Sequence, residues 1–470
     1  MKPWKTILVL GVLAGVFLIA QETGLVSLLR SEAGIGRQSG GFYLLPTNQL
    51  LRPWGEQSPI PGRPVDLAFD STQRLLAVLN YRGVWLMDGS SGAKLAEVPS
   101  KSTSYAGVAF RPGDRELWAS EATRNGPDSI LIAELNELGL PVQSARIALE
   151  GHPVPAGIAF SADGATAYVA FSRNNTLAVI DAATRRVKQE IPVGIAPFAV
   201  AAANQQGRIF VTNRGGRRPR PGDAVAPTSG SLVASDPVTG AAVSGTVTVI
   251  DSETLAAREI PVGLAPSGMA LSPDQRTLAV VNGHSDSVSL LDARSLAKTE
   301  VKIPSWPDSL GSQPVAAAFA PDGNTLYLAC GGTNAIAVLT AGKAWKVAGA
   351  VPTGWFPSGL LIDREGSLRI VNIKGTGNTA NPKGNFNSRQ YEGSLVKIPA
   401  PAPSQLAAAT REVRAANTPK FAPAGGVSNL SALGIRHVFF IIKENRTYDQ
   451  VFGDIAKGNG DPRLVFFGGT

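Results

Sequence analysis

Cysteine and histidine are scarce in this chain, and their scarcity excludes several kinds of site. The one cysteine, Cys330, cannot form an intramolecular disulfide, and its place at the end of an apolar run predicts a small core residue. The three histidines are His152, His284 and His437, and none is paired with carboxylates at a metal-ligand spacing. A disulfide framework or a histidine-rich metal site is therefore not expected.

A strong excess of either charge is also missing. Lys and Arg number 44 and Asp and Glu number 36, so the formal net charge of +8 is modest for 470 residues. The densest basic cluster consists of Arg214, Arg217, Arg218 and Arg220. No aromatic residues interleave with it, so a nucleic-acid surface is not expected. Two prolines between the charges favour a solvated loop, and a site for phosphate or anionic lipid is the alternative.

One long hydrophobic run lies at the amino terminus. Residues 6–20 form an uninterrupted stretch of 15 residues behind the basic start at residues 1–5. This is short for a membrane span and typical of a signal-peptide core. We expect an exported protein of the periplasm or cell envelope, with residues 1–41 forming a signal peptide or membrane anchor and a tether. Cleavage after Ala20 and retention as an uncleaved anchor through residues 6–20 both stay open.

Glycine and proline are plentiful, with 51 and 34 residues, so short strands and tight turns must dominate. The clearest unit lies near the middle of the chain. Residues 269–271 are an apolar run, and residues 273–275 form a tight Pro-Asp turn. Residues 277–281 and 288–291 are two further strands, the last ending at Asp292. One such unit cannot bury both faces of its sheet, so copies must stack.

Seven copies of this unit can be counted. They begin at Gly62, Tyr105, Pro155, Pro197, Pro266, Pro314 and Pro357. Periods of about 40–50 residues with four strands each predict a propeller, and helical spacing is missing, which argues against an α-solenoid. We predict an all-β fold, a seven-bladed β-propeller over residues 42–399.

The ring must close on itself. Residues 43–51 read as a strand without a partner, and the seventh copy has three strands of its own, the last at residues 394–398. We predict that the segment near Gln49 completes the last blade. Two long excursions, residues 214–244 and 374–391, follow the second strands of their copies and are expected on the same rim.

The string Phe210-Val211-Thr212-Asn213 and the recurring Val-Ile-Asp signals resemble the YVTN-type β-propeller family. The resemblance covers about residues 42–399 and implies binding or scaffolding, with occasional catalysis. Lactonase-like propellers share the architecture and keep acidic and histidine groups in the central channel. Three histidines in the whole chain disfavour that function. His284 is expected at a blade edge, and a place facing the channel is the alternative.

After residue 399 the composition changes. Residues 399–403 alternate proline and alanine and predict a stiff extended linker. Ser404 is expected to cap an alanine-rich helix over residues 405–414. Residues 400–434 are therefore assigned as a Pro-rich linker and helix.

A continuous apolar run over residues 435–443 predicts a strand buried on both faces. Glu444 and Asn445 follow at once and offer hard oxygen ligands for a divalent metal, and Arg446 offers a phosphate partner. Polar groups at the carboxyl end of a buried strand occupy the place where open α/β sheets build sites. A carboxylate at a helix N-terminus is the alternative.

Residues 437–449, HVFFIIKENRTYD, look like the opening strand and first metal motif of the phosphoesterase family in the alkaline-phosphatase superfamily. The resemblance implies that Glu444 and Asn445 are metal ligands and that Arg446 contacts substrate. It also implies that a divalent metal of unknown identity activates a Ser or Thr nucleophile. That nucleophile would lie beyond Thr470. Residues 435–470 are therefore expected to be an incomplete start of an α/β phosphoesterase domain, inactive as given.

Three functions stay open. The first is an exported propeller joined to a metal-dependent phosphoesterase, whose partner is a phosphoester substrate. The second is a propeller of the cell envelope that only binds a ligand or acts as a scaffold, with no cofactor of its own. The third is a lactonase-like enzyme that uses the channel.

Overall fold

The computed structural model describes residues 36–38, 40–228, 230–307, 311–377, 392–418, 451–456 and 462–465. Hence residues 1–35, which contain the predicted signal or anchor, and residues 419–450 lie outside the described part. The chain divides into two compact units. The larger, which we call the ring unit, spans Pro53–Asn378 and Arg389–Ala415.

The ring unit contains seven four-stranded antiparallel sheets. Sheet 1 comprises β5 (Asp66–Phe69), β6 (Leu75–Asn80), β7 (Gly83–Asp88) and β8 (Lys94–Pro99). Sheet 2 comprises β9 (Thr103–Phe110), β10 (Glu116–Glu121), β11 (Ser129–Leu135) and β12 (Pro141–Ala148). Sheet 3 comprises β13 (Pro155–Phe160), β14 (Thr166–Phe171), β15 (Thr176–Asp181) and β16 (Arg186–Pro192). Sheet 4 comprises β17 (Ile195–Ala203), β18 (Arg208–Gly216), β21 (Gly245–Asp251) and β22 (Ala257–Val262).

Sheet 5 comprises β23 (Pro266–Leu271), β24 (Thr277–Asn282), β25 (Ser287–Asp292) and β26 (Lys298–Lys302). Sheet 6 comprises β27 (Pro314–Phe319), β28 (Thr325–Cys330), β29 (Ala335–Thr340) and β30 (Lys346–Pro352). Sheet 7 comprises β31 (Trp355–Ile362), β32 (Leu368–Gly375), β33 (Glu392–Ile398) and β4 (Glu56–Pro61). A short 3₁₀ turn, η1 (Asn204–Gln206), links β17 to β18. The number of four-stranded sheets equals the number of repeats in the sequence.

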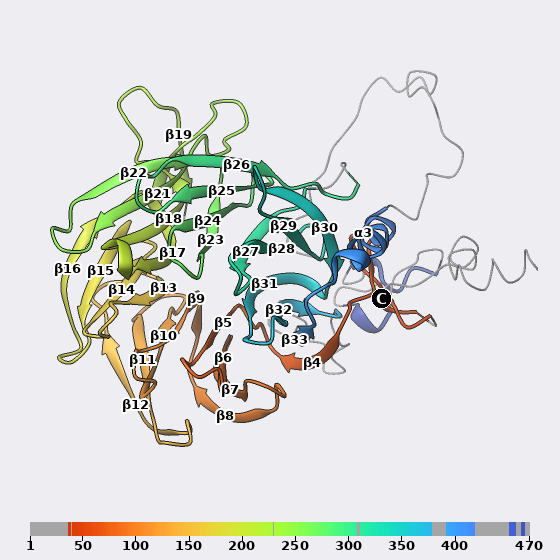
Figure 1. Ribbon diagram of the computed structural model, residues 1–470, viewed down its shortest axis with the longest axis horizontal. Helices are drawn as coiled ribbons and strands as arrows, with labels where there is room; N and C mark the ends of the chain where they lie inside the picture. The colour runs from red at the N-terminus through yellow and green to blue at the C-terminus, as the bar shows by residue number, and fades with distance from the viewer. Residues whose placement is uncertain are drawn as a thin grey trace, which may run out of the picture. The chain divides into compact units, whose positions relative to one another are not determined.

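The seven sheets are arranged around a common centre (Figure 1). The first strand of each sheet contacts the first strand of the next, and β31 of sheet 7 contacts β5 of sheet 1. These first strands are therefore the inner wall of a closed ring. Each inner strand is a short sheet edge that faces the channel, and closure of the ring protects these edges.

Burial changes from the inside of each sheet to its outside. Second strands such as β6 and β24 are buried along almost their whole length, because neighbouring sheets cover both faces. Outer strands such as β16 have one buried residue among seven. The continuous apolar runs in the sequence are thus the strands packed between sheets.

Turn chemistry sets the reversals within each repeat. In sheet 5, Ser272 Oγ donates to Asp274 Oδ1 at 2.6 Å in the predicted Pro-Asp turn. The third strand ends at Asp292, whose Oδ1 accepts the Ser295 amide at 2.6 Å and its hydroxyl at 2.8 Å. The same turn is built at Asp88, Asp181 and Asp251. The recurring Val-Ile-Asp signal is therefore a hairpin-turn signal.

The strand that completes sheet 7 is not the predicted one. β4 pairs with β33, with Leu395 opposite Ser58 and Lys397 opposite Glu56. The segment near Gln49 instead forms a small sheet of the second unit, in which β2 (Tyr43–Leu44) pairs with β1 (Gly36–Arg37) and β3 (Leu50–Leu51). The prediction of closure by Gln49 is wrong in position. Ile60 of β4 is fully buried among apolar residues of sheets 7 and 1, and this packing stabilises the pairing of β4 with β33.

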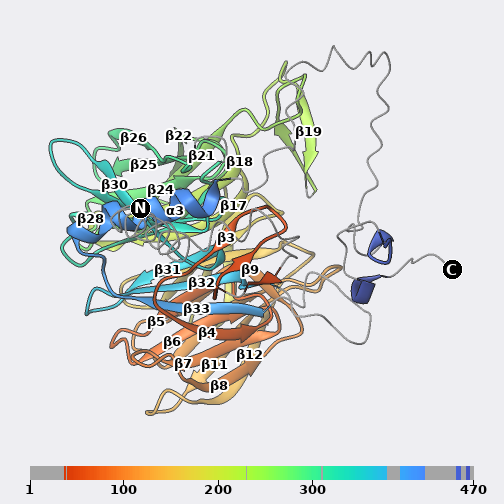
Figure 2. The same cartoon turned by 90° about the vertical axis from the view of Figure 1, so that its right-hand side faces the viewer.

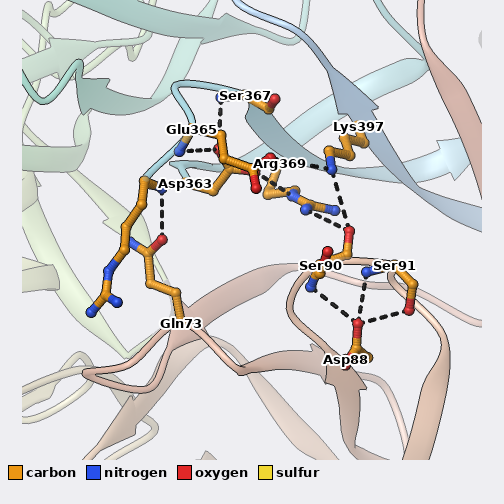
Figure 3. A network of polar contacts seen from close by, with 10 residues as sticks. Gln73, Asp88, Ser90, Ser91, Asp363, Glu365, Ser367, Arg369 and Lys397 are labelled. Atoms are coloured by element: carbon orange, nitrogen blue, oxygen red, sulfur yellow. Dashed lines mark hydrogen bonds and ion pairs between the residues drawn. The ribbon is translucent and has the colours of Figure 1, made fainter.

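Polar contacts hold sheets 7 and 1 together beside this closing strand (Figure 3). Arg369 is 1% exposed, and its Nε donates to Asp363 Oδ2 at 3.2 Å. Its Nη2 donates to the Ser90 carbonyl in the β7–β8 turn at 2.9 Å, and Lys397 Nζ reaches the same oxygen at 3.3 Å. A buried cation of sheet 7 is thus satisfied partly by sheet 1.

The predicted helix is present and lies against the ring. α3 (Pro403–Asn417) buries Leu406, Ala409 and Val413 against sheets 6 and 7. It begins before the predicted cap Ser404, because Pro403 suits the first helical position and Gln405 Oε1 accepts the Ala402 amide at 2.9 Å. The short 3₁₀ turn η3 (Pro462–Leu464) lies in the second unit.

Cys330 lies at the end of β28 and is fully buried, as predicted. Burial raises the pKa of its thiol to about 12. We expect no alkylation by iodoacetamide at pH 8 in the native protein and rapid alkylation in denaturing urea, because the thiolate is the reactive form. Mass spectrometry measures the modified fraction. Fast modification of the native protein would contradict the burial described here.

The excursion in sheet 4 contains a hairpin of β19 (Val225–Thr228) and β20 (Ser231–Ala234). It projects beyond the sheets (Figure 2), and Asn175 Nδ2 ties it to sheet 3 by donating to Ser231 Oγ at 2.9 Å. The excursion in sheet 7 lies outside the described residues between 378 and 391. Among the described residues, no helix is long and apolar enough to cross a membrane.

Candidate functional site

A cavity of about 400 Å³ occupies the centre of the ring. Residues of all seven inner strands line it, which identifies it as the central channel. Its size is in the range of cavities that enclose small-molecule ligands. Four of its lining residues are ionisable: Asp66, Tyr105, Arg214 and His284.

Comparison of the seven repeats singles out Asp66. The third residue of each inner-strand motif is Gly107, Gly157, Ala199, Gly268, Ala316 and Gly359 in repeats two to seven. In the first repeat the motif is counted from Pro64, which aligns with the leading prolines of the later repeats, and its third residue is Asp66. Small residues suit this position because a Cβ at Gly107 would lie 2.0 Å from the Ala156 carbonyl of the next sheet. The aspartate therefore departs from a packing rule that the other six repeats follow.

Asp66 is held in place by main-chain amides. Its Oδ1 accepts from the Leu67 amide at 2.9 Å, and its Oδ2 accepts from the Gly107 amide at 2.8 Å. Burial raises the pKa of this carboxyl to about 6, against the opposite effect of these amides. No cation of the described residues forms an ion pair with it. At neutral pH it is a carboxylate in the channel wall without a counter-ion from the described chain.

Cations and aromatic rings gather where the inner strands begin. Ile195 pairs with Gly216 and Trp355 with Gly375, so inner strands start beside the ends of second strands. We call this edge of the ring the mouth. There Arg63 lies over Tyr105 at 5.7 Å from the ring centroid, and Arg214 lies over Phe198 at 4.9 Å.

Lys374 adds a third cation to the mouth. Its Nζ lies 4.6 Å from the Trp355 ring and 6.0 Å from the Phe356 ring. Desolvation lowers the pKa of Lys374, and the nearby charge of Arg63 lowers it further. Desolvation also lowers the pKa of Arg214. Neither Arg63 nor Arg214 forms an ion pair with a carboxylate of the described residues. The mouth therefore favours a bound anion, and its aromatic faces keep the cations in place.

The predicted basic cluster is divided by the fold. Arg217 forms a bidentate pair with Asp223, with distances of 2.6 and 2.9 Å. Arg218 donates to the Asn175 and Val193 carbonyls at 2.8 and 3.0 Å. Arg217 therefore braces the loop internally, and Arg218 holds it against sheet 3. Of the cluster, Arg214 alone lines the channel.

The other predicted site residues differ in outcome. His284 follows β24 and lines the channel, which was the less favoured alternative. His152 Nδ1 lies 2.8 Å from Asp128 Oδ2, away from the channel lining. No cluster of three or more His, Cys, Asp or Glu suited to a metal occurs among the described residues. Glu444, Asn445, Arg446 and His437 lie outside the described residues, so the metal-ligand prediction stays a prediction.

Comparison with known proteins gives a fold and no family. No family model and no curated protein matches the chain. It is similar to hydrazine synthase of Kuenenia stuttgartiensis, with TM-score 0.53 and 15% identity over 72% of this chain and 96% of that chain. A streptogramin B lyase gives TM-score 0.52 and 14% identity, over 73% and 98%. The WD40 repeats of RRP9 give TM-score 0.54 and 13% identity, over 72% and 94%.

These likenesses and the ring of sheets define the class: the chain is a β-propeller protein. At such low identity they show the fold alone. None of the comparisons supports the phosphoesterase resemblance of residues 435–470, which rests on the sequence string. Sequence reasoning missed Asp66, although aligning the third residue of each repeat would have found it.

Proposed function

We propose that this protein is an exported, seven-bladed propeller whose channel recognises a small anionic ligand. The observation that carries the proposal is the placement of Arg63, Arg214 and Lys374 at one mouth, each on an aromatic face. A cation that is already partly desolvated loses less hydration when an anion binds, and charge-assisted hydrogen bonds to an oxyanion are strong.

Phenyl phosphate is a suitable probe, because it has an oxyanion for the arginines and a ring for the aromatic faces. We expect calorimetric titration to show one binding site per chain. Arg214→Gln is expected to weaken this binding about tenfold or more, because it removes a charged donor from the channel.

Arg276→Gln is the matched control. Arg276 lies in the β23–β24 turn, at the opposite end of the inner strands, with 79% of its side chain exposed. We expect it to bind phenyl phosphate like the unaltered protein. Equal affinity of the Arg214 and Arg276 variants would contradict the proposal.

A second candidate function follows from residues 437–449. We propose that the propeller serves a metal-dependent phosphoesterase, in which Glu444 and Asn445 would hold the metal and Arg446 would contact the phosphoryl group. A bound divalent metal would supply Lewis-acid stabilisation of the phosphoryl charge. The cationic mouth supports this candidate, because a channel that accepts oxyanions suits a protein that acts on phosphoesters.

The test is hydrolysis of p-nitrophenyl phosphate, with added divalent metals, by the full-length gene product. Glu444→Gln is expected to abolish metal-dependent turnover and to leave phenyl phosphate binding at the channel unchanged. Metal-dependent turnover that survives this substitution would exclude Glu444 as a ligand.

A further inference from the structure

Two charges of opposite sign share the channel and do not meet. Asp66 belongs to sheet 1 and Arg214 to sheet 4, so in a ring of seven sheets they lie on opposite walls. Neither forms an ion pair with the other or with another described residue. Each has lost part of its hydration, as the raised pKa of Asp66 and the lowered pKa of Arg214 indicate.

A purely structural role accounts for only part of this arrangement. The Leu67, Gly107 and Val108 amides leave part of the hydrogen-bonding capacity of the Asp66 carboxylate unused, because its two oxygens can accept about four hydrogen bonds. The six other repeats build the same inter-sheet contact with glycine or alanine. The fold therefore does not require a carboxylate here, and its charge is uncompensated within the described part of the chain.

We infer that the channel ligand is zwitterionic, with an oxyanion toward Arg214 and an ammonium group toward Asp66. This inference rests on the proposed function and adds the second charge. A single ligand that spans the channel would neutralise both walls at once, and each charge would gain a hydrogen-bonded partner. Phosphate and carboxylate are two sources of the same oxyanion chemistry.

The test compares pairs of compounds that differ in the ammonium group. O-phosphoethanolamine and ethyl phosphate form the phosphate pair, and β-alanine and propionate form the carboxylate pair. We expect the unaltered protein to bind the ammonium-bearing member of at least one pair about tenfold or more tightly. The pair that shows the preference identifies the oxyanion.

Asp66→Asn is expected to abolish the preference, because it removes the negative charge that the ammonium group would contact. Asp274→Asn, in the exposed β23–β24 turn, is the matched control and should keep the preference. The ratio of affinities in the unaltered protein needs no substitution, so a misfolded variant leaves the test intact.

The pH dependence of the preference is a second measurement, and a purely structural role of Asp66 would leave it unchanged. The ratio between phosphoethanolamine and ethyl phosphate is measured in the unaltered protein and in Asp66→Asn, because titration of the two phosphates is the same for both proteins. In the unaltered protein the preference should fall to that of Asp66→Asn as pH drops through about 6, where the Asp66 carboxyl takes up a proton. The other ionisable lining residues are Tyr105, Arg214 and His284, and they are the same in both proteins.

The outcomes are distinct. Equal affinity within both pairs, with binding lost in Arg214→Gln, would overturn the zwitterion inference and keep the proposed function. A preference that survives Asp66→Asn would also overturn it. Failure of all phosphate and carboxylate compounds to bind would overturn the proposed function itself.

Discussion

Replacing Arg369 by leucine is expected to lower the free energy of unfolding by about 3 kcal/mol, at the lower end of the range for breaking a buried ion pair. The Arg369 side chain is 2% exposed and that of Asp363 is 8% exposed. The substitution leaves Asp363 buried and takes one donor from the Ser90 carbonyl of sheet 1. Asp363 keeps the Glu365 and Ser367 amides as partners, which limits the loss.

Arg115→Leu is the matched control for this prediction. Arg115 pairs with Glu137 at 3.7 Å, and their side chains are 65% and 88% exposed. Solvent screens such a pair, so the change in stability is expected to stay below about 1 kcal/mol. Urea unfolding followed by tryptophan fluorescence measures both variants, and an equal shift of their midpoints would rule out a special role for the seam between sheets 7 and 1 (Figure 3).

Truncating Ile60 to alanine is expected to lower the free energy of unfolding by about 2–5 kcal/mol. Ile60 is fully buried and packs with Leu67 and Leu76 of sheet 1 and with Leu395 of sheet 7. The loss of stability has two parts: the burial free energy of the removed carbon atoms and the cost of the cavity that they leave. Because β4 closes the ring, weaker packing here also favours opening between sheets 7 and 1.

Val142→Ala, on the outer strand β12 with 65% exposure, is the control and is expected to change stability by less than about 0.5 kcal/mol. Alkylation of Cys330 in native buffer gives an independent readout of ring opening, because this thiol lies in sheet 6 and is buried only while the sheets are packed. If the Ile60 variant matched the Val142 variant in both measurements, β4 would not be the strand that secures the ring.

The repeats and their strands could be predicted because their signals are local. Short apolar and β-branched runs mark the strands, and the Pro-Asp turn and the aspartate that ends the third strand of sheets 1, 3, 4 and 5 mark hairpins. These signals act over a few residues, so reading them requires no knowledge of the distant chain. The helix over residues 403–417 could be predicted for the same reason. Its start was predicted too late, because Pro403 occupies the first helical position and Ser404 is not the cap.

The closing strand could not be chosen from the sequence. Residues 43–51 and 56–61 are both short, partly apolar segments before the first repeat. By sequence alone, either segment could be the strand that pairs with the last sheet. Pairing with β33 decides between them, and that contact joins residues more than 300 positions apart. No local pattern carries this information, because it depends on which side chain fills the space between sheets 7 and 1.

The sequence by itself determined a chain of similar stranded repeats, since turn residues and short apolar runs act within each unit. Only the tertiary structure decided that Ile60 seals the ring, that Arg217 and Arg218 brace a loop, and that Asp66 stands across the channel from Arg214. The reason is that ring closure brings together residues from every repeat, and the charge of a site depends on which of them face the same enclosed space.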